Sequence, residues 1–206
     1  TIRVEDGPLK KIEGKVINLK STNISKDFVD EHMNRVFGYS TAIDPKSYSG
    51  VAVRKSNINA LHDGQKINCP VKAEEGFIYQ KFIDSSVNDS EVMDIRVVVI
   101  SRSIPHVYLN YRNNTERFKN VPDRAELCQN PSEYLSDDEQ NLILEFCSSI
   151  GLDYGELDVL RDCDDKRIYI VDANNTPQGP PKNLSQRDHV KSIELLTQAF
   201  KKEFLS

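Results

Sequence analysis

Three segments of the chain repeat apolar residues every three or four positions, which is the period of a helix with one buried face. Ser136 precedes the second segment and Glu139 follows three residues later, the spacing of a capping box. Ser25 and Gly38 bound the first segment as start and stop signals. The helices predicted in this way cover residues 26–36, 137–150 and 186–204. We expect the core-facing residues of the third helix to be Val190, Ile193, Leu196 and Phe200.

Between these helices, short apolar runs bounded by turn residues predict β-strands. The run Ile95–Ile100 is almost continuously apolar, which is typical of a central strand with both faces buried. The segment 113–131 is polar, and we expect it to be irregular. The remaining predicted strands cover residues 15–19, 51–53, 77–83, 106–111 and the two sides of the hairpin 162–166. This order of elements indicates an α+β fold with mainly antiparallel sheets.

Composition narrows the class of protein. The 206 residues carry a formal net charge of −5, which argues against nucleic acid or an acidic membrane surface as the main partner. The chain has no apolar run long enough to span a bilayer and no signal-peptide pattern, so we expect a cytoplasmic protein. Four widely spaced cysteines without a CxxC pair predict reduced thiols, and Cys147 is expected in the core.

Oxygen-bearing side chains interrupt or follow two apolar strands. Asp158 stands between Leu157 and Val159, while Asp172 ends the next apolar run and Asn174 lies two residues further. Residues i and i+2 of a strand point to the same side, and pairing across the hairpin would bring Asp158 within reach of both. Two carboxylates and an amide oxygen suit Mg²⁺. A polar hairpin end with exposed acidic residues is the alternative explanation.

The run Val171-Asp-Ala-Asn-Asn-Thr-Pro177 resembles the metal-binding signature of the ATP-grasp superfamily, in which Glu is commoner than Asp at the position of Asp172. The resemblance covers the chain from about Ser25 onward. Its motif order is most similar to that of glutathione synthetase and ribosomal-protein glutamate ligase. It implies a two-lobed ATP-grasp fold that binds nucleotide between the lobes, with Asp158, Asp172 and Asn174 as metal ligands.

The resemblance also implies two lysines that clamp the ATP phosphates as point charges. Lys26 opens a helix in the manner of the first ATP-grasp lysine, and Lys55 ends a strand in the manner of the second. A solvated surface side chain is the alternative for each lysine. Residues 56–64 depart from the family's glycine-rich flap, and His62 within them is either a substrate contact or an exposed turn residue.

The run Gln80-Lys81-Phe82-Ile83 resembles the strand that receives adenine between the two lobes. In that interpretation the main chain of Lys81 and Ile83 bonds the purine edge, and Phe82 or Ile83 packs near the ring. Asp84 follows directly and is placed to hold the ribose. A buried strand without a ligand is the alternative.

Three arginines complete the resemblance. Asp94-Ile-Arg96 resembles an Asp-x-Arg motif of the same branch, Arg112 matches a basic residue after the next strand, and Arg117 with Asn120 resembles its Arg-x-Asn loop. An arginine fork binds phosphate or carboxylate oxygens at two points, which implies catalytic roles for Arg96 and Arg112. Scattered surface arginines are the alternative.

Taken together, the resemblance implies an N-terminal remnant at residues 1–24, a small lobe at 25–83 and a large lobe with the metal site at 84–206. It implies an ATP- and Mg²⁺-dependent ligase that joins a carboxylate to an amine through an acylphosphate. The partners would be small-molecule or peptide carboxylates and amines, and a homo-oligomer stays open. A nucleotide-binding protein without ligase activity and an ATP-grasp kinase are the alternatives.

Overall fold

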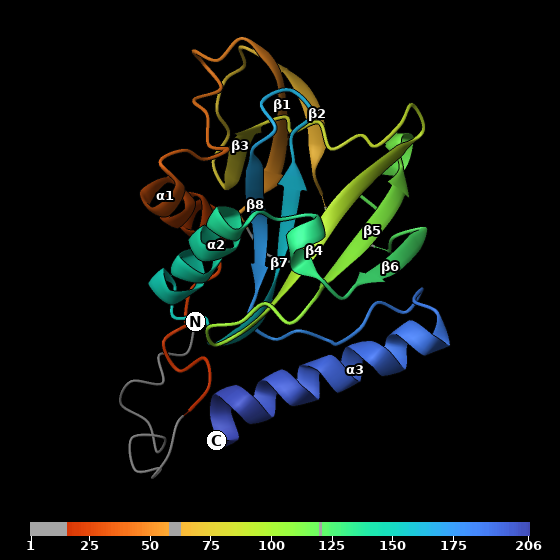
Figure 1. The fold of residues 1–206 in the computed structure, drawn as a ribbon. Coiled ribbons are helices and arrows are strands. Elements are labelled where there is room, and N and C mark those ends of the chain that lie inside the picture. The colour runs from red at the N-terminus through yellow and green to blue at the C-terminus, as the bar shows by residue number, and fades with distance from the viewer. Residues whose placement is uncertain (1–15, 58–62, 120) are drawn as a thin grey trace.

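The computed structural model describes residues 16–57, 63–119 and 121–206, and within these ranges two β-sheets combine with three α-helices (Figure 1). The helices are α1 (Lys26–Phe37), α2 (Asp137–Ser149) and α3 (Gln186–Phe200), and a π-helical turn, η5 (Lys201–Leu205), continues α3. The strands are β1 (Gly50–Ser56), β2 (Gln65–Cys69), β3 (Phe77–Lys81), β4 (Glu91–Ile100), β5 (Val107–Asn113), β6 (Arg124–Cys128), β7 (Tyr154–Arg161) and β8 (Ile168–Asn174).

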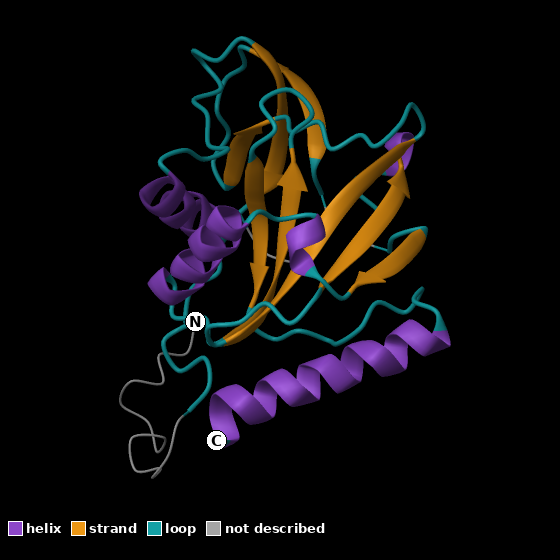
Figure 2. Cartoon of the chain, viewed as in Figure 1, coloured by secondary structure: helices purple, strands orange, loops and turns teal. Residues whose placement is uncertain are grey.

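Both sheets are antiparallel throughout, which confirms the α+β prediction. The small sheet has the strand order β2-β1-β3, and the large sheet has the order β6-β5-β4-β7-β8. Figure 2 shows α1 and α2 together on one side of the large sheet and α3 across its end. Strand β4 is central, as its apolar run predicts, because it pairs with β5 on one side and β7 on the other.

The core lies between the large sheet and the pair of helices α1 and α2. Val97, Leu157 and Val159 face the helices and are fully buried, as is Cys147 of α2. Each large apolar side chain buried in this way stabilises the fold by roughly 1.5–3 kcal/mol. The predicted capping box fixes the start of α2, where Ser136 and Glu139 exchange hydrogen bonds. This core makes the large sheet a rigid support for its opposite face.

That opposite face is polar near the middle of the sheet. In β4 and β7, Asp94, Arg96 and Asp158 alternate with the core residues Ile95 and Leu157. Because successive side chains of a strand point to opposite sides, these charged groups leave the core and turn toward the small sheet.

The apolar face predicted for α3 is wrong at two positions. Val190 is 54% exposed and Ile193 is 45% exposed, whereas Ser192 is buried. The helix meets only a small apolar patch on the sheet, which includes Val98 and Tyr108, and that patch accommodates one narrow side of the helix. Packing area, rather than the helix's own pattern, therefore decides which residues are covered.

Two strand predictions also need correction. Strand β6 lies inside the segment expected to be irregular, because Ala125 and Leu127 alternate with the charged Arg124 and Glu126 over only five residues. The strand predicted at 15–19 is a turn from residue 17 onward, and Lys15 lies outside the described residues. The Asn18 side chain shapes this turn, since its Oδ1 accepts hydrogen bonds from two main-chain amides of the 153–154 segment. Within the described ranges, no helix has the length and apolar character needed to cross a membrane.

His106 gives the fold a distinct acid sensitivity. Its ring is buried, neither ring nitrogen has a hydrogen-bond partner among the described residues, and burial lowers its pKa from 6.5 to about 4. As the pH falls below about 6.5, His106 binds a proton in the unfolded chain, whereas in the folded protein it stays neutral until about pH 4. Stability contributed by neutral His106 is therefore present above pH 6.5 and is lost as the pH falls through this window.

We expect His106→Phe to remove this part of the acid sensitivity. Between pH 7 and pH 4 the variant should lose less unfolding free energy than the wild type, by up to about 3 kcal/mol. Urea titrations at several pH values measure the difference. His189→Phe, which changes an exposed histidine on α3, is the control and should follow the wild type. Parallel curves for wild type and His106→Phe would contradict the assignment.

Candidate functional site

A cavity of about 200 Å³ lies between the two sheets, and most of the residues singled out in the sequence line it. Among the predicted site residues it contains Lys26, Lys55, Gln80, Lys81, Phe82, Ile83, Arg96, Arg112, Asp158 and Asp172. Asp84 and Asn174 are absent from its lining, and each side chain serves a local turn instead. Asp84 accepts from the main chain and hydroxyl of Ser86, and Asn174 accepts from the amide of Thr176. His62 and Asn120 lie outside the described residues.

Asp158 and Asp172 stand directly opposite each other across β7 and β8. The next pair is Val159 with Ile170, so Val171 is an extra residue that forms a β-bulge. Like charges placed opposite in a sheet repel. Asp172 Oδ1 is buried with no hydrogen-bond partner among the described residues, and burial together with Asp158 raises the pKa of Asp172 above its ordinary value. A positive charge beside this pair would offset the repulsion, and Lys55 and Lys26 already lower the pKa of Asp172 in this way.

Arg96 supplies one positive charge to this pair. It lies opposite Asp158 in the register of β4 and β7, and its Nε donates to Asp158 Oδ1 at 2.9 Å. Its Nη1 is also 3.9 Å from Oε2 of Glu156, a buried residue whose pKa burial raises to about 7. Sequence reasoning did not select Glu156. The period-two rule was the available signal, because Glu156 lies two residues before Asp158 on the same face of the strand.

Arg112 is held in the same way by Asp94, with which it forms an ion pair. Its Nε donates to the main-chain oxygen of Lys119 at 2.7 Å, so the guanidinium is oriented from two sides. Burial raises the pKa of Asp94 to about 6 despite the nearby arginine. Arg96 and Arg112 therefore face the cavity as oriented forks, and each has a carboxylate partner from the sheet.

Two lysines reach the cavity, one from β1 of the small sheet and one from α1. Lys55, at the end of β1, donates from Nζ to the main-chain oxygen of Val171 at 3.2 Å. Burial lowers its pKa to about 8, and Asp172 acts in the opposite direction. A second cation, Lys26, begins α1 and is close enough to depress the pKa of Lys55 further. An anion between these lysines would offset the cost of burying both.

The segment Lys81–Ile83, which we call the hinge, runs along the cavity between β3 and the large sheet. Two cations contact its Phe82 ring, with Lys66 Nζ at 4.0 Å and the Arg117 guanidinium at 4.2 Å from the ring centroid. Arg117 also donates to the main-chain oxygen of Ile83 at 2.9 Å. The preceding residue, Gln80, donates to Asp30 at 2.7 Å. These contacts fix the side chains around the segment. Its main chain is also engaged, since the amides of Lys81 and Phe82 donate to the main-chain oxygens of Thr41 and Val51.

The acidic pair has the donor chemistry of a Mg²⁺ site. Among the described residues, no three His, Cys, Asp or Glu side chains are grouped as a metal cluster. Mg²⁺ ordinarily takes one or two protein carboxylates and completes its coordination with phosphate and water oxygens. The carboxylates of Asp158 and Asp172 fit that requirement, because Oδ1 of Asp172 has no hydrogen-bond partner in the part of the chain that the structure describes.

Comparisons with known proteins agree with this geometry at the level of the fold. No protein-family model matches the sequence, and no curated protein matches it either. Solved structures do match, and they show that the chain has the ATP-grasp fold predicted by the resemblance. Sequence identities to these structures lie below 25%, so the likeness concerns the fold alone.

The similar structures include the ATP-grasp ligase PsnB. PsnB complexed with the precursor peptide PsnA2 and AMPPNP is 16% identical with a TM-score of 0.58, and the match covers 89% of this chain and 61% of PsnB. D-alanine–D-alanine ligase from Bacillus anthracis complexed with ATP is 12% identical with a TM-score of 0.56, covering 91% of this chain and 67% of that ligase. The macrocyclase MdnC, bound with the precursor peptide MdnA from Microcystis aeruginosa MRC, is 13% identical with a TM-score of 0.50, covering 87% and 60%. The chain thus spans about 60% of the length of PsnB.

The repulsion between the two carboxylates predicts an unusual response to Asp172→Asn. A raised pKa means that the folded protein disfavours the charged carboxylate, so the stability tied to Asp172 falls as the pH rises through that pKa. Amidation removes this charge, and we expect the metal-free variant to melt at or above the wild-type temperature at pH 7.5. The gain should vanish near pH 4.

Thermal melts in EDTA at both pH values measure this effect, with Asp89→Asn in an exposed loop as the control. A lower melting temperature for Asp172→Asn at pH 7.5 would show instead that the carboxylate has a structural hydrogen-bonding role.

Proposed function

We propose that the protein is an ATP- and Mg²⁺-dependent ligase that joins a carboxylate to an amine through an acylphosphate. The observation that carries the proposal is the cavity between the sheets, which gathers lysines, arginines, the hinge and the acidic pair in one place. The ATP-grasp fold supports it. The carboxylate and amine would belong to small molecules or peptides, and the two lobes would correspond to residues 25–83 and 84–206.

In this proposal each group of residues around the cavity binds one part of Mg·ATP. Lys26 and Lys55 bind the α- and β-phosphates, and the hinge binds adenine through main-chain groups. Asp158 and Asp172 would hold Mg²⁺, which when bound would neutralise phosphate charge and orient the terminal phosphate. Asn174 would join them only after leaving its turn with Thr176. Asp84 would reach the ribose only after leaving its present turn.

The arginines act on the reacting groups. A substrate carboxylate oxygen attacks the γ-phosphorus of ATP, the bond to the β-phosphate oxygen breaks, and ADP leaves. The amine then attacks the carbonyl carbon of the acylphosphate, the carbon–oxygen bond to phosphate breaks, and the amine loses a proton. Arg96 and Arg112 stabilise the phosphoryl and carboxylate oxygens during both steps, because their forks are already oriented toward the cavity.

Mg·ATP should raise the melting temperature of the protein. A ligand that binds only the folded state stabilises it by RT ln(1 + [L]/Kd), about 2.7 kcal/mol at 100 times Kd. Lys55→Met should reduce this stabilisation, because losing one charge-assisted contact weakens ATP binding by roughly tenfold or more. Differential scanning fluorimetry and calorimetric titration measure both effects.

The matched control is Lys46→Met, which removes an exposed lysine from the loop before β1 and should leave ATP affinity unchanged. Lys26→Met should weaken binding less than Lys55→Met. Absence of a shift at millimolar Mg·ATP, together with a silent titration, would remove nucleotide binding from the proposal.

Product analysis separates the ligase from its alternatives. Hydroxylamine attacks acylphosphates in place of the amine substrate. A screen of carboxylic acids with ATP, Mg²⁺ and hydroxylamine can therefore find the acid substrate without knowledge of the amine. We expect ADP, phosphate and a hydroxamate in equal amounts, and none of these from Asp172→Asn. ADP with a phosphorylated hydroxyl compound would indicate a kinase. Tight ATP binding without any turnover across an unbiased substrate screen would indicate a non-catalytic nucleotide-binding protein.

A further inference from the structure

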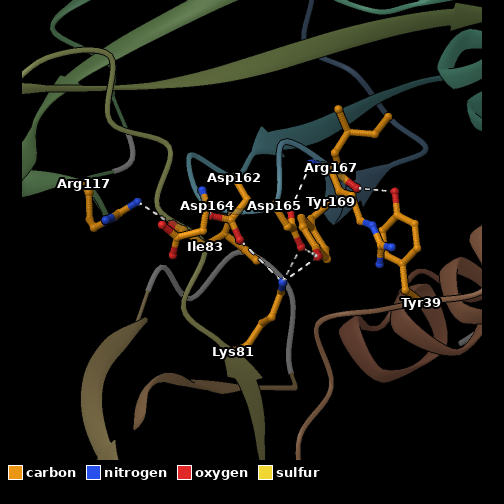
Figure 3. Close-up of polar contacts among 10 residues, drawn as sticks. Tyr39, Lys81, Ile83, Arg117, Asp162, Asp164, Asp165, Arg167 and Tyr169 are labelled. Carbon is orange, nitrogen blue, oxygen red and sulfur yellow. Dashed lines mark hydrogen bonds and ion pairs between the residues drawn. The ribbon is translucent and has the colours of Figure 1, made fainter.

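A polar cluster outside the reacting part of the cavity joins the two sheets (Figure 3). Lys81 ends β3 of the small sheet, and its Nζ reaches the hairpin between β7 and β8 of the large sheet. There it donates to Tyr169 Oη at 2.5 Å and to Asp165 Oδ2 at 3.2 Å, and it lies 3.5 Å from Asp162 Oδ2. Side chains from both sheets therefore meet around one ammonium group.

The cluster is more constrained than an ordinary surface ion pair. Tyr169 is almost fully buried, and its hydroxyl donates to Asp165 Oδ2 while it accepts from Lys81. The Lys81 ammonium also lies 4.0 Å from the centroid of the Tyr169 ring, which adds a cation–π contact. A lone exposed pair contributes little because its side chains are mobile and solvated, whereas here the partners fix one another.

The same lysine is the first residue of the hinge. Its main chain pairs with Ala52 of β1 and donates to Thr41 at 2.7 Å, so the small sheet holds its backbone. At the other end of the hinge, Arg117 from the large-sheet side holds the main-chain oxygen of Ile83. Figure 3 shows the side-chain contacts of Lys81 at one end of the hinge and the hydrogen bond from Arg117 to Ile83 at the other. The hinge main chain is thus attached to the small sheet at Lys81 and to the Arg117 side chain at Ile83, and the Lys81 side chain links the first attachment to the β7–β8 hairpin.

We propose that Lys81, Asp165 and Tyr169 form an inter-sheet tie that positions the hinge main chain for a purine base. This inference rests on the proposed function and assigns these side chains a positioning role. The phosphates would be held by Lys26 and Lys55, which come from α1 and β1. The tie should consequently set affinity for the base while leaving affinity for the phosphate chain nearly unchanged.

Two conservative substitutions break the tie. Tyr169→Phe removes only the hydroxyl and keeps the buried ring, and Lys81→Met removes the ammonium and keeps an unbranched stem. The control is Tyr39→Phe, because the Tyr39 hydroxyl donates to the main chain of Ile168 on the same strand and its ring packs edge-on against Tyr169. It shares the surroundings of the tie without bonding the hinge.

Calorimetric titrations with Mg·ATP and with Mg·tripolyphosphate separate base from phosphate. We expect Tyr169→Phe and Lys81→Met each to weaken ATP binding by about tenfold while changing tripolyphosphate binding less than twofold. The double variant should be no weaker than the poorer single variant, since both changes remove the same interaction. Tyr39→Phe should bind both ligands as the wild type does.

Amide hydrogen exchange of the ligand-free protein gives a second readout that does not need ATP. The amides of residues 82 and 83 should exchange faster in Tyr169→Phe and Lys81→Met than in the wild type or Tyr39→Phe.

Equal losses of ATP and tripolyphosphate affinity, or wild-type ATP affinity in both variants, would overturn the tie and leave the proposed function standing. A wild-type protein that binds neither ligand would overturn the proposed function and the base-positioning role together.

Discussion

The strict alternation of side chains in β4 and β7 is the constraint on which the rest of the molecule depends. Ile95, Val97 and Leu157 face α1 and α2, and this leaves Arg96 and Asp158 no direction except toward the small sheet. A slip of one residue between sheet and helices would bury an ion pair in the core and expose the apolar set. The packing of the hydrophobic core therefore determines on which face of the sheet the charged site lies.

Charge balance is the second feature that the sheet imposes. Arg96 has Asp158 and Glu156 within reach, and Arg112 has Asp94, so both guanidinium groups are compensated before any ligand arrives. In the proposed function, a metal ion bound at Asp158 would share that carboxylate with Arg96. Glu156, on the same strand, would then offer the Arg96 guanidinium a second anionic neighbour. The site is consequently a set of exchangeable pairs rather than an unpaired positive pocket.

The sequence predicts those elements whose pattern depends on neighbours within a few residues. The capping box at Ser136 predicts the start of a helix, and α2 begins there. The apolar run of β4 predicts a central strand, and Asp172 lies near the end of β8 as its spacing predicts. The order of the motifs predicted the fold, and the cavity gathers most of the candidate residues.

The predictions that failed concern contacts between segments that are distant in the sequence. Exposure of Val190 depends on how much sheet lies under α3, and β6 becomes a strand because β5 offers it an edge. Lys81 and Tyr169 are 88 positions apart, and the sequence around neither residue predicts their contact.

The bulge at Val171 has a consequence for how the site can change. An extra residue in one strand releases its main-chain groups from the regular ladder, and here the Val171 oxygen accepts the hydrogen bond from Lys55. The bulge also sets which way Asp172 points, because one residue fewer would turn that carboxylate toward the helices. The presence of an extra residue at position 171 therefore matters more for the geometry of the site than the identity of its side chain. Substitutions there alter the cavity wall and a contact at the edge of the core, whereas a single-residue deletion would remove both the acidic pair and the lysine contact.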